Sequence, residues 1–124
     1  GRVEEIYDVA HNPHGAAALA AALAARPCGG RTLAVCAMLA DKDAAGVAAA
    51  LCDQVHVWYL AGLDTERGQS AQALAARMPS ITTPQVYMAP AAALAAARAE
   101  ARAGDRIVVF GSFHTIAELL PPGL

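Results

Sequence analysis

Short apolar segments alternate with alanine-rich segments along the whole chain, and this alternation limits the possible folds more than any other sequence feature. Three apolar segments are strand-like: TLAVCAM at Thr32–Met38, VHVWYL at Val55–Leu60 and IVVF at Ile107–Phe110. Their continuous apolar character is typical of strands buried on both faces of a parallel sheet. The sequence therefore predicts an α/β fold, with a mostly parallel sheet of five or six strands and helices on both faces.

Polar side chains and prolines mark where the helices between these strands begin. Asn12 is an N-cap residue, and Pro13 fits the first helical position because its missing N–H costs nothing there. Asp43 and Ser70 are similar caps, and Gly104 is expected to end a helix. We expect helices at positions 13–23, 44–52, 71–78, 91–103 and 115–120, a first strand near position 6 and a weak strand at 85–88.

Composition excludes several classes of partner. The 124 residues suffice for one domain, and 56% hydrophobic with 16% charged residues indicates a globular chain. A net charge of −2 offers no basic surface for nucleic acid. No apolar run reaches the ~18 residues of a membrane span. We therefore expect neither a nucleic-acid partner nor a membrane partner.

The cysteines and the start of the chain suggest the cellular setting. Cys28, Cys36 and Cys52 lack metal-site spacing, so they predict reduced thiols in a cytoplasmic protein. The chain begins at Gly1 without an initiator methionine and enters a strand almost at once. We expect it to be a piece of a longer protein.

Three turns that follow predicted strands carry clusters of polar residues. Because ligands of doubly wound sheets gather outside the carboxyl ends of the strands, these turns are expected to meet at one site. The clusters are Asp8/His11/Asn12, Asp41/Lys42/Asp43 and Ser112/His114.

The first cluster lies beside backbone amides at a helix N-terminus, a place that favours an anion. The Asp8 carboxylate could take ribose hydroxyls, and the His11 imidazole could take a phosphate. Alternatively, both residues only stabilise the turn. A metal site with His14 is a further alternative, but without a firm third ligand we expect no metal here.

The other two clusters are equally open to two interpretations. Lys42 is either a solvated charge near a helix cap or a point charge for a carboxylate or phosphate. The hydroxyl and amide of Ser112 are expected to open onto the edge of the sheet. The sequence FGSFH lacks the G-x-S-x-G of a nucleophile elbow, and neither G-x-G-x-x-G nor a Walker A loop is present. His56 and Trp58 are expected to be structural.

Four segments together resemble the C-terminal domain of bacterial folylpolyglutamate synthase/dihydrofolate synthase, one of the Mur-type amide ligases. The segments are DVAHNPHGAAAL, MLADKDAAGVAAAL, WYLAGLDTERGQSAQALA and DRIVVFGSFHTIAELL, in that order. DVAHNP, DKD and GSFHT are specific to this family. The resemblance spans nearly the whole chain. It implies that residues 1–124 form a single Rossmann-like domain, a fragment of a longer enzyme that lacks the central ATPase domain.

The resemblance also implies an activity. ATP phosphorylates a carboxylate of dihydropteroate or of a folate γ-glutamyl tail, and the amine of L-glutamate attacks the acyl phosphate. ATP and Mg²⁺ are the implied cofactors, with the magnesium ligands on the missing central domain, which is the implied partner of this one. The implied ATP contacts are Asp8, His11 (also catalytic) and Asn12, and the implied glutamate contacts are Lys42, Ser112 and His114.

Two other functions stay open at this point. The chain would be a free-standing Rossmann-like nucleotide-binding or interaction module if no ATPase domain precedes it. A metal-dependent hydrolase built from Asp8, His11 and Asp43 is the third candidate. For the ligase we expect a monomer, inactive when reduced to these 124 residues.

Overall fold

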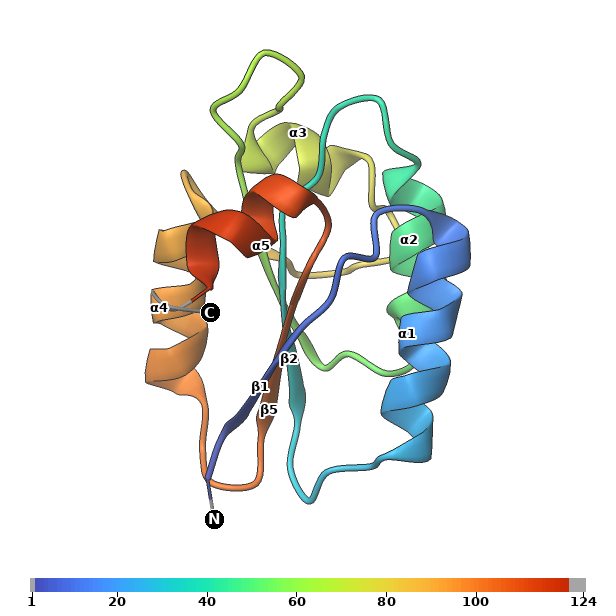
Figure 1. The fold of residues 1–124 in the computed structure, drawn as a ribbon, viewed down its shortest axis with the longest axis vertical. Helices are drawn as coiled ribbons and strands as arrows, with labels where there is room; N and C mark the ends of the chain where they lie inside the picture. The colour runs from blue at the N-terminus through green and yellow to red at the C-terminus, as the bar shows by residue number, and fades with distance from the viewer. Residues whose placement is uncertain (1, 121–124) are drawn as a thin grey trace.

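Five parallel strands form a single sheet in the order β1-β5-β2-β3-β4. The computed structural model describes residues 2–120 (Figure 1). The strands are β1 (Glu4–Tyr7), β2 (Thr32–Cys36), β3 (Val57–Ala61), β4 (Gln85–Tyr87) and β5 (Arg106–Phe110). Within the described part of the chain, the sheet therefore has five strands, and the predicted α/β, Rossmann-like class is confirmed.

The helices cover both faces of this sheet (Figure 1). They are α1 (Pro13–Ala25), α2 (Ala44–Leu51), α3 (Ala71–Ala76), α4 (Pro90–Glu100) and α5 (Phe113–Leu119). Side chains of α1, α2 and α3 share one hydrophobic cluster, and those of α4 and α5 share another. From Leu33 to Cys36, successive residues of β2 alternate between the two clusters, which is why this part of the strand is apolar.

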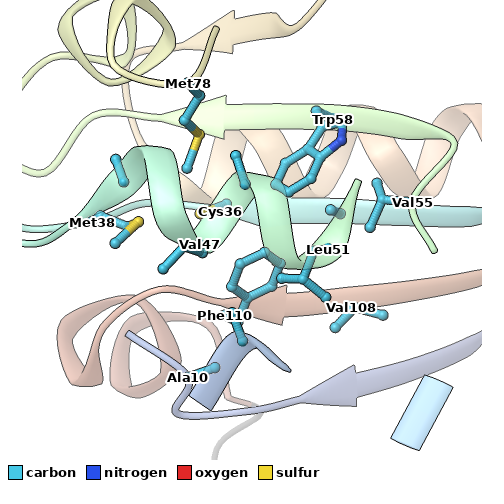
Figure 2. Close-up of a cluster of buried hydrophobic side chains, with 14 of the residues drawn as sticks. Ala10, Cys36, Met38, Val47, Leu51, Val55, Trp58, Met78, Val108 and Phe110 are labelled. Atoms are coloured by element: carbon cyan, nitrogen blue, oxygen red, sulfur yellow. The ribbon is translucent and has the colours of Figure 1, made fainter. Parts of the chain in front are cut away.

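Aromatic and aliphatic side chains fill the core on the α1–α2–α3 face (Figure 2). Trp58 and Phe110 meet edge to face with ring centroids 6.1 Å apart. Val47 and Leu51 of α2 are fully buried in the same cluster. Each such aliphatic side chain contributes roughly 1.5–3 kcal/mol by burial. Trp58 is therefore structural, as predicted.

Several predicted helix boundaries differ from the structure by one to three residues, and those of α4 and α5 have a clear local cause. Helix α5 begins at Phe113, not at Thr115, because Ser112 is its N-cap and accepts a hydrogen bond from the Thr115 N–H at 3.1 Å. Helix α4 ends at Glu100, three residues earlier than expected. Gly104 does not end the helix; its φ of +93° belongs to a separate turn that leads into β5. A left-handed residue in such a turn favours glycine.

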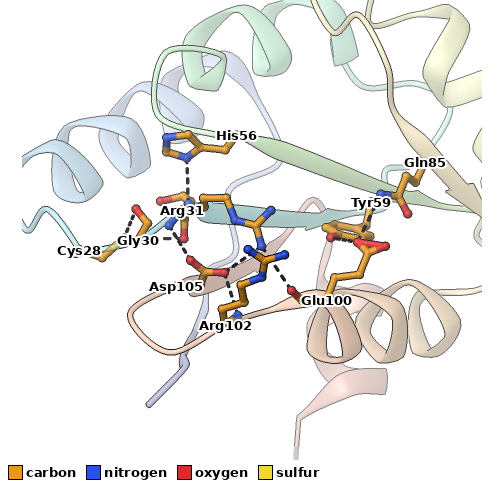
Figure 3. Close-up of polar contacts among 10 residues, drawn as sticks. Cys28, Gly30, Arg31, His56, Tyr59, Gln85, Glu100, Arg102 and Asp105 are labelled. Carbon is orange, nitrogen blue, oxygen red and sulfur yellow. Dashed lines mark hydrogen bonds and ion pairs between the residues drawn. The ribbon is translucent and has the colours of Figure 1, made fainter. Parts of the chain in front are cut away.

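A polar network closes the amino end of the sheet (Figure 3). The buried Asp105 carboxylate accepts from the Arg31 N–H at 2.7 Å and from the Arg102 N–H at 2.9 Å, and it pairs with the Arg31 guanidinium at 3.0 Å. These donors lower the pKa of Asp105 to about 2. The His56 Nδ1 accepts from the Thr32 N–H at 2.9 Å, so His56 is structural, as predicted.

Candidate functional site

The carboxyl ends of β1, β5 and β2, which are adjacent in the sheet, bring the three polar turns to one edge. A cavity of about 240 Å³ opens between them. Four of its six lining residues are ones that the sequence had singled out. The lining residues are His11, Leu39, Lys42, Gly111, Ser112 and His114. The convergence of the turns is thus confirmed, while the role of each residue stays a prediction.

A second cavity, of about 330 Å³, lies beside the first over the start of α1. Asp8 and Asn12 line it, and His11 lines both cavities. The exposed His14 also lines this second cavity, on the solvent side of the first helical turn. The structure therefore separates the predicted ATP residues from the predicted glutamate residues, with His11 at the junction.

Local hydrogen bonds shape the turn after β1. One carboxylate oxygen of Asp8 accepts from the Ala10 N–H at 2.8 Å, and the Asn12 side-chain oxygen accepts from the Gly15 N–H at 2.7 Å. These bonds use one oxygen of each side chain. Among residues 2–120, the second Asp8 oxygen and the Asn12 amide nitrogen have no hydrogen-bond partner and remain available to a ligand.

The orientation of the His11 ring follows from a single contact. Its Nδ1 lies 2.9 Å from the Val9 carbonyl oxygen. Because a carbonyl can only accept, Nδ1 carries the proton, and the neutral ring keeps Nε2 as an acceptor. His11 therefore offers a proton acceptor at the junction of the two cavities.

Lys42 lies half-buried in the first cavity between two aspartates, neither of which neutralises it. Asp41 pairs instead with Arg67, and this ion pair lowers the pKa of the carboxyl. The Asp43 side chain caps α2 by accepting from the Gly46 N–H at 3.0 Å. Within the described residues the Lys42 ammonium forms no ion pair. Lys42 lines the cavity together with Gly111, Ser112 and His114 of the GSFHT turn.

The Ser112 hydroxyl is less free than the sequence suggested. It accepts from the Thr115 N–H and lies 3.0 Å from the Thr115 hydroxyl, which itself donates to the Ala37 carbonyl at 3.2 Å. The Ser112 proton is thus directed to Thr115. This hydroxyl caps α5 and is already hydrogen-bonded to Thr115. It is therefore not the open hydroxyl that was expected from the sequence. Binding a carboxylate through it would require the Ser112–Thr115 pair to rearrange.

Gly111 allows this turn to pack against the end of β2. Its φ is +123°, and a Cβ on it would lie 2.1 Å from the Ala37 carbonyl oxygen. Only glycine fits such a close approach of two backbones. Gly111 was not predicted separately from the sequence, although a Gly-Ser pair directly after a buried strand is the signal that points to it.

No group of three or more His, Cys, Asp or Glu side chains within residues 2–120 could hold a metal ion. Asp43, one member of the suggested hydrolase site, is engaged in the α2 cap. The described helices also include none that is long and apolar enough to cross a membrane.

A family model described as "Mur ligase, glutamate ligase domain" matches residues 1–113. The chain belongs to this family. The dihydrofolate synthase/folylpolyglutamate synthase of Escherichia coli (strain K12) is 44% identical over 115 residues, which cover 93% of this chain and 26% of that enzyme. The enzyme of the same description from Haemophilus influenzae is 38% identical over 119 residues, covering 91% and 27%.

Solved structures of family members share the fold. E. coli FolC in complex with DHPP and ADP has a TM-score of 0.85 at 44% identity, covering 92% of this chain and 27% of that one. A bifunctional folylpolyglutamate synthase/dihydrofolate synthase with Mn, AMPPNP and L-glutamate bound also has a TM-score of 0.85, at 38% identity, covering 95% and 29%. The chain thus spans about a quarter of the length of these relatives. The resemblance found in the sequence is confirmed.

Proposed function

We propose that this chain is the domain of an ATP-dependent amide ligase that binds L-glutamate and closes over the ATP site. The ligase would add glutamate to dihydropteroate, or to the γ-glutamyl tail of a folate, through an acyl phosphate. One observation carries the proposal. Lys42, a cation without an ion-pair partner among residues 2–120, lines a cavity with His11, Ser112 and His114, and this cavity suits a small anionic amino acid.

In this proposal Lys42 is the point charge that holds a carboxylate of glutamate. At 4 Å and an effective dielectric constant near 20, two unit charges attract by about 4 kcal/mol. Part of this energy is lost to desolvation of the ammonium and of the carboxylate. Ser112 and the exposed His114 complete the glutamate cavity.

Asp8, His11 and Asn12 would form the edge presented to ATP. The Asp8 and Asn12 atoms that local bonds leave free suit ribose and phosphate groups. The His11 Nε2 would accept a proton from the glutamate amine as its nitrogen attacks the acyl carbon and phosphate leaves. Mg²⁺ would be held by the central domain, and closure of the two domains would keep water from the acyl phosphate. Relatives crystallised with ADP, and with AMPPNP and Mn, support ATP and a divalent metal ion as the cofactors.

The proposed partners are L-glutamate, dihydropteroate or folates, and the central ATPase domain of the same polypeptide. We propose a cytoplasmic, monomeric parent enzyme. A free-standing nucleotide-binding module is the other candidate, and an upstream reading frame with a Walker A segment would exclude it.

Steady-state kinetics of the intact ligase tests the proposal. Lys42→Ala should raise the KM for glutamate by about tenfold or more, equivalent to at least ~1.4 kcal/mol, and change the KM for ATP by less than twofold. Arg26→Ala is the matched control, because Arg26 is an exposed cation that pairs with Glu4 outside the cavity. Equal rises in both KM values, or no rise, would contradict the proposal.

A further inference from the structure

The loop between β2 and α2, which carries Lys42, is held by Arg67 and Gln69 from the segment before α3 and by Arg77 from the end of α3. The Gln69 amide nitrogen donates to the carbonyl oxygens of Met38 and Leu39 at 3.1 and 3.3 Å. Gln69 lies in the segment that joins β3 to α3, and β3 is the neighbour of β2 in the sheet.

Arg67, from the same segment, holds the next two residues of the loop. Its carbonyl oxygen accepts from the Ala40 N–H at 2.8 Å, and its guanidinium pairs with Asp41. Asp41 therefore forms its ion pair with Arg67 and not with the neighbouring Lys42.

Arg77, the C-cap residue of α3, completes the series. One guanidinium nitrogen donates to the Lys42 carbonyl oxygen, and another donates to the Gln69 side-chain oxygen at 3.2 Å. The amide nitrogen and the amide oxygen of Gln69 are therefore both hydrogen-bonded, which determines the orientation of the amide. Positions 38 to 42 are each contacted by Arg67, Gln69 or Arg77.

The contact from Arg77 is made to the backbone carbonyl of Lys42 and does not involve the Lys42 ammonium. A lysine side chain loses rotamer entropy when it forms an ion pair, and a mobile backbone beneath it would add to that entropic cost. The planar guanidinium fork of Arg77 can bridge the Lys42 carbonyl and the Gln69 oxygen at once, whereas a lysine ammonium would not hold both in that geometry.

We propose that Arg77, with Gln69, is a positioning residue for the glutamate carboxylate. It holds the backbone of Lys42 so that the ammonium meets the ligand, without contacting the ligand itself. This inference rests on the proposed function, in which Lys42 binds glutamate.

Kinetics of the intact ligase with Arg77→Met and Arg77→Lys tests the inference. Both variants should raise the KM for glutamate about fivefold or more while kcat and the KM for ATP stay within twofold. Gln69→Leu, which leaves Arg77 in place, should raise the same KM and serves as the second variant should an Arg77 substitution fail to fold. Arg26→Met is the matched arginine control and should leave all three constants unchanged.

A double-mutant cycle identifies the route of the effect. If Arg77 acts through Lys42, then Arg77→Met should add less than twofold to the KM for glutamate in a Lys42→Ala background. Hydrogen exchange of the intact ligase should also quicken at positions 38–43 in Arg77→Met, with β5 unchanged.

The outcomes separate the two proposals. If Lys42→Ala raises the KM for glutamate but the Arg77 and Gln69 variants do not, the positioning role is wrong and the proposed function stands. Full additivity in the cycle, or a wild-type KM in Arg77→Lys, would also overturn it, since the latter would show that charge alone suffices. If Lys42→Ala has no effect, both proposals fail.

Discussion

Polar side chains gather at both ends of the sheet, but they are used differently. At the amino end the buried Arg106 guanidinium donates to the Thr32 hydroxyl at 2.8 Å and to the Leu23 carbonyl at 3.1 Å, while Asp105 accepts from several donors. At the carboxyl end Lys42 has no ion-pair partner among residues 2–120. The polar groups at the amino end bond to one another and to the end of α1, whereas the Lys42 ammonium at the carboxyl end can pair with a ligand.

The difference shows which polar residues of this domain are free to bind a ligand. Buried charges are normally paired or hydrogen-bonded because leaving water is costly. The amino end follows this rule within the chain itself, as Figure 3 shows for the contacts around Asp105. At the carboxyl end, the Lys42 ammonium and the Nε2 of His11 have no such partner among residues 2–120 and can bind a ligand. We therefore expect substitutions at the amino end to change stability, and those at the carboxyl end to change substrate constants as well.

The largest effect on stability is expected from Gly111→Ala, at the carboxyl end. A Cβ would lie 2.1 Å from the Ala37 carbonyl oxygen at a φ of +123°, so the free energy of unfolding should fall by about 3 kcal/mol or more. Gly29→Ala is the control at the amino end, because its Cβ would meet nothing within 4 Å. Chemical denaturation of both variants measures the difference, and similar losses would contradict the contact with Ala37.

Asp105→Asn should lower the melting temperature by several degrees, because the amide nitrogen would replace the oxygen that accepts from either the Arg31 N–H or the Arg102 N–H and leave that donor without an acceptor. The native carboxylate has a pKa lowered to about 2, so its stabilising contribution is complete above the ordinary value near 4 and is lost as pH falls towards 2. Thermal unfolding between pH 2 and 7 should show a smaller acid dependence in the variant.

The comparison requires that Asp105→Asn leave the KM for glutamate unchanged below its melting temperature. Asp53→Asn, at an exposed aspartate, is the control and should keep both the melting temperature and its acid dependence. A rise in the KM for glutamate in Asp105→Asn would break the distinction between the two ends.

Ser112→Ala and Ser70→Ala compare two N-caps, of which only Ser112 lines the cavity. Each should cost about 0.5–2 kcal/mol of stability, because each hydroxyl satisfies one backbone N–H at a helix start. Only Ser112→Ala should also raise the KM for glutamate severalfold. Equal KM values in the two variants would assign Ser112 to the cap alone.

The smallest effect is expected from Glu4→Gln. Glu4 pairs with Arg26 at 3.0 Å, but both side chains are largely exposed, at 49% and 70%. Such pairs contribute about 0–1 kcal/mol and are screened by salt. Denaturation should show a loss below 1 kcal/mol at low salt and a still smaller loss at high salt. A larger loss would show that the amino end depends on exposed ion pairs as well as on its buried network.

The parts of this protein that could be predicted from its sequence depend on short-range rules. The apolar runs of β2 and β5 predict buried parallel strands. The N-caps Asn12, Asp43 and Ser70 each accept a hydrogen bond from a backbone N–H three residues later in the chain. The convergence of the polar turns follows from the general geometry of parallel sheets. The boundaries of α4 and α5 were missed because Ser112 and Gly104 each suit more than one local structure.

Other features depend on contacts between residues far apart in the chain. The freedom of Lys42 depends on Asp41 pairing with Arg67, 26 positions away, and the support of its backbone depends on Arg77, 35 positions away. The Ser112 hydroxyl is hydrogen-bonded to Thr115, and the Thr115 hydroxyl in turn donates to the Ala37 carbonyl, 78 positions away.

Sequence patterns alone established the α/β class, the family resemblance and the three turns that meet at the carboxyl edge. They did so because periodicity and capping act within a few residues and because parallel strands share one direction. Only the tertiary structure decided which polar atoms at that edge remain free and which segment holds Lys42 in place. That outcome depends on which distant groups come within hydrogen-bonding distance, such as Arg67 beside Asp41 and Arg77 beside the Lys42 carbonyl.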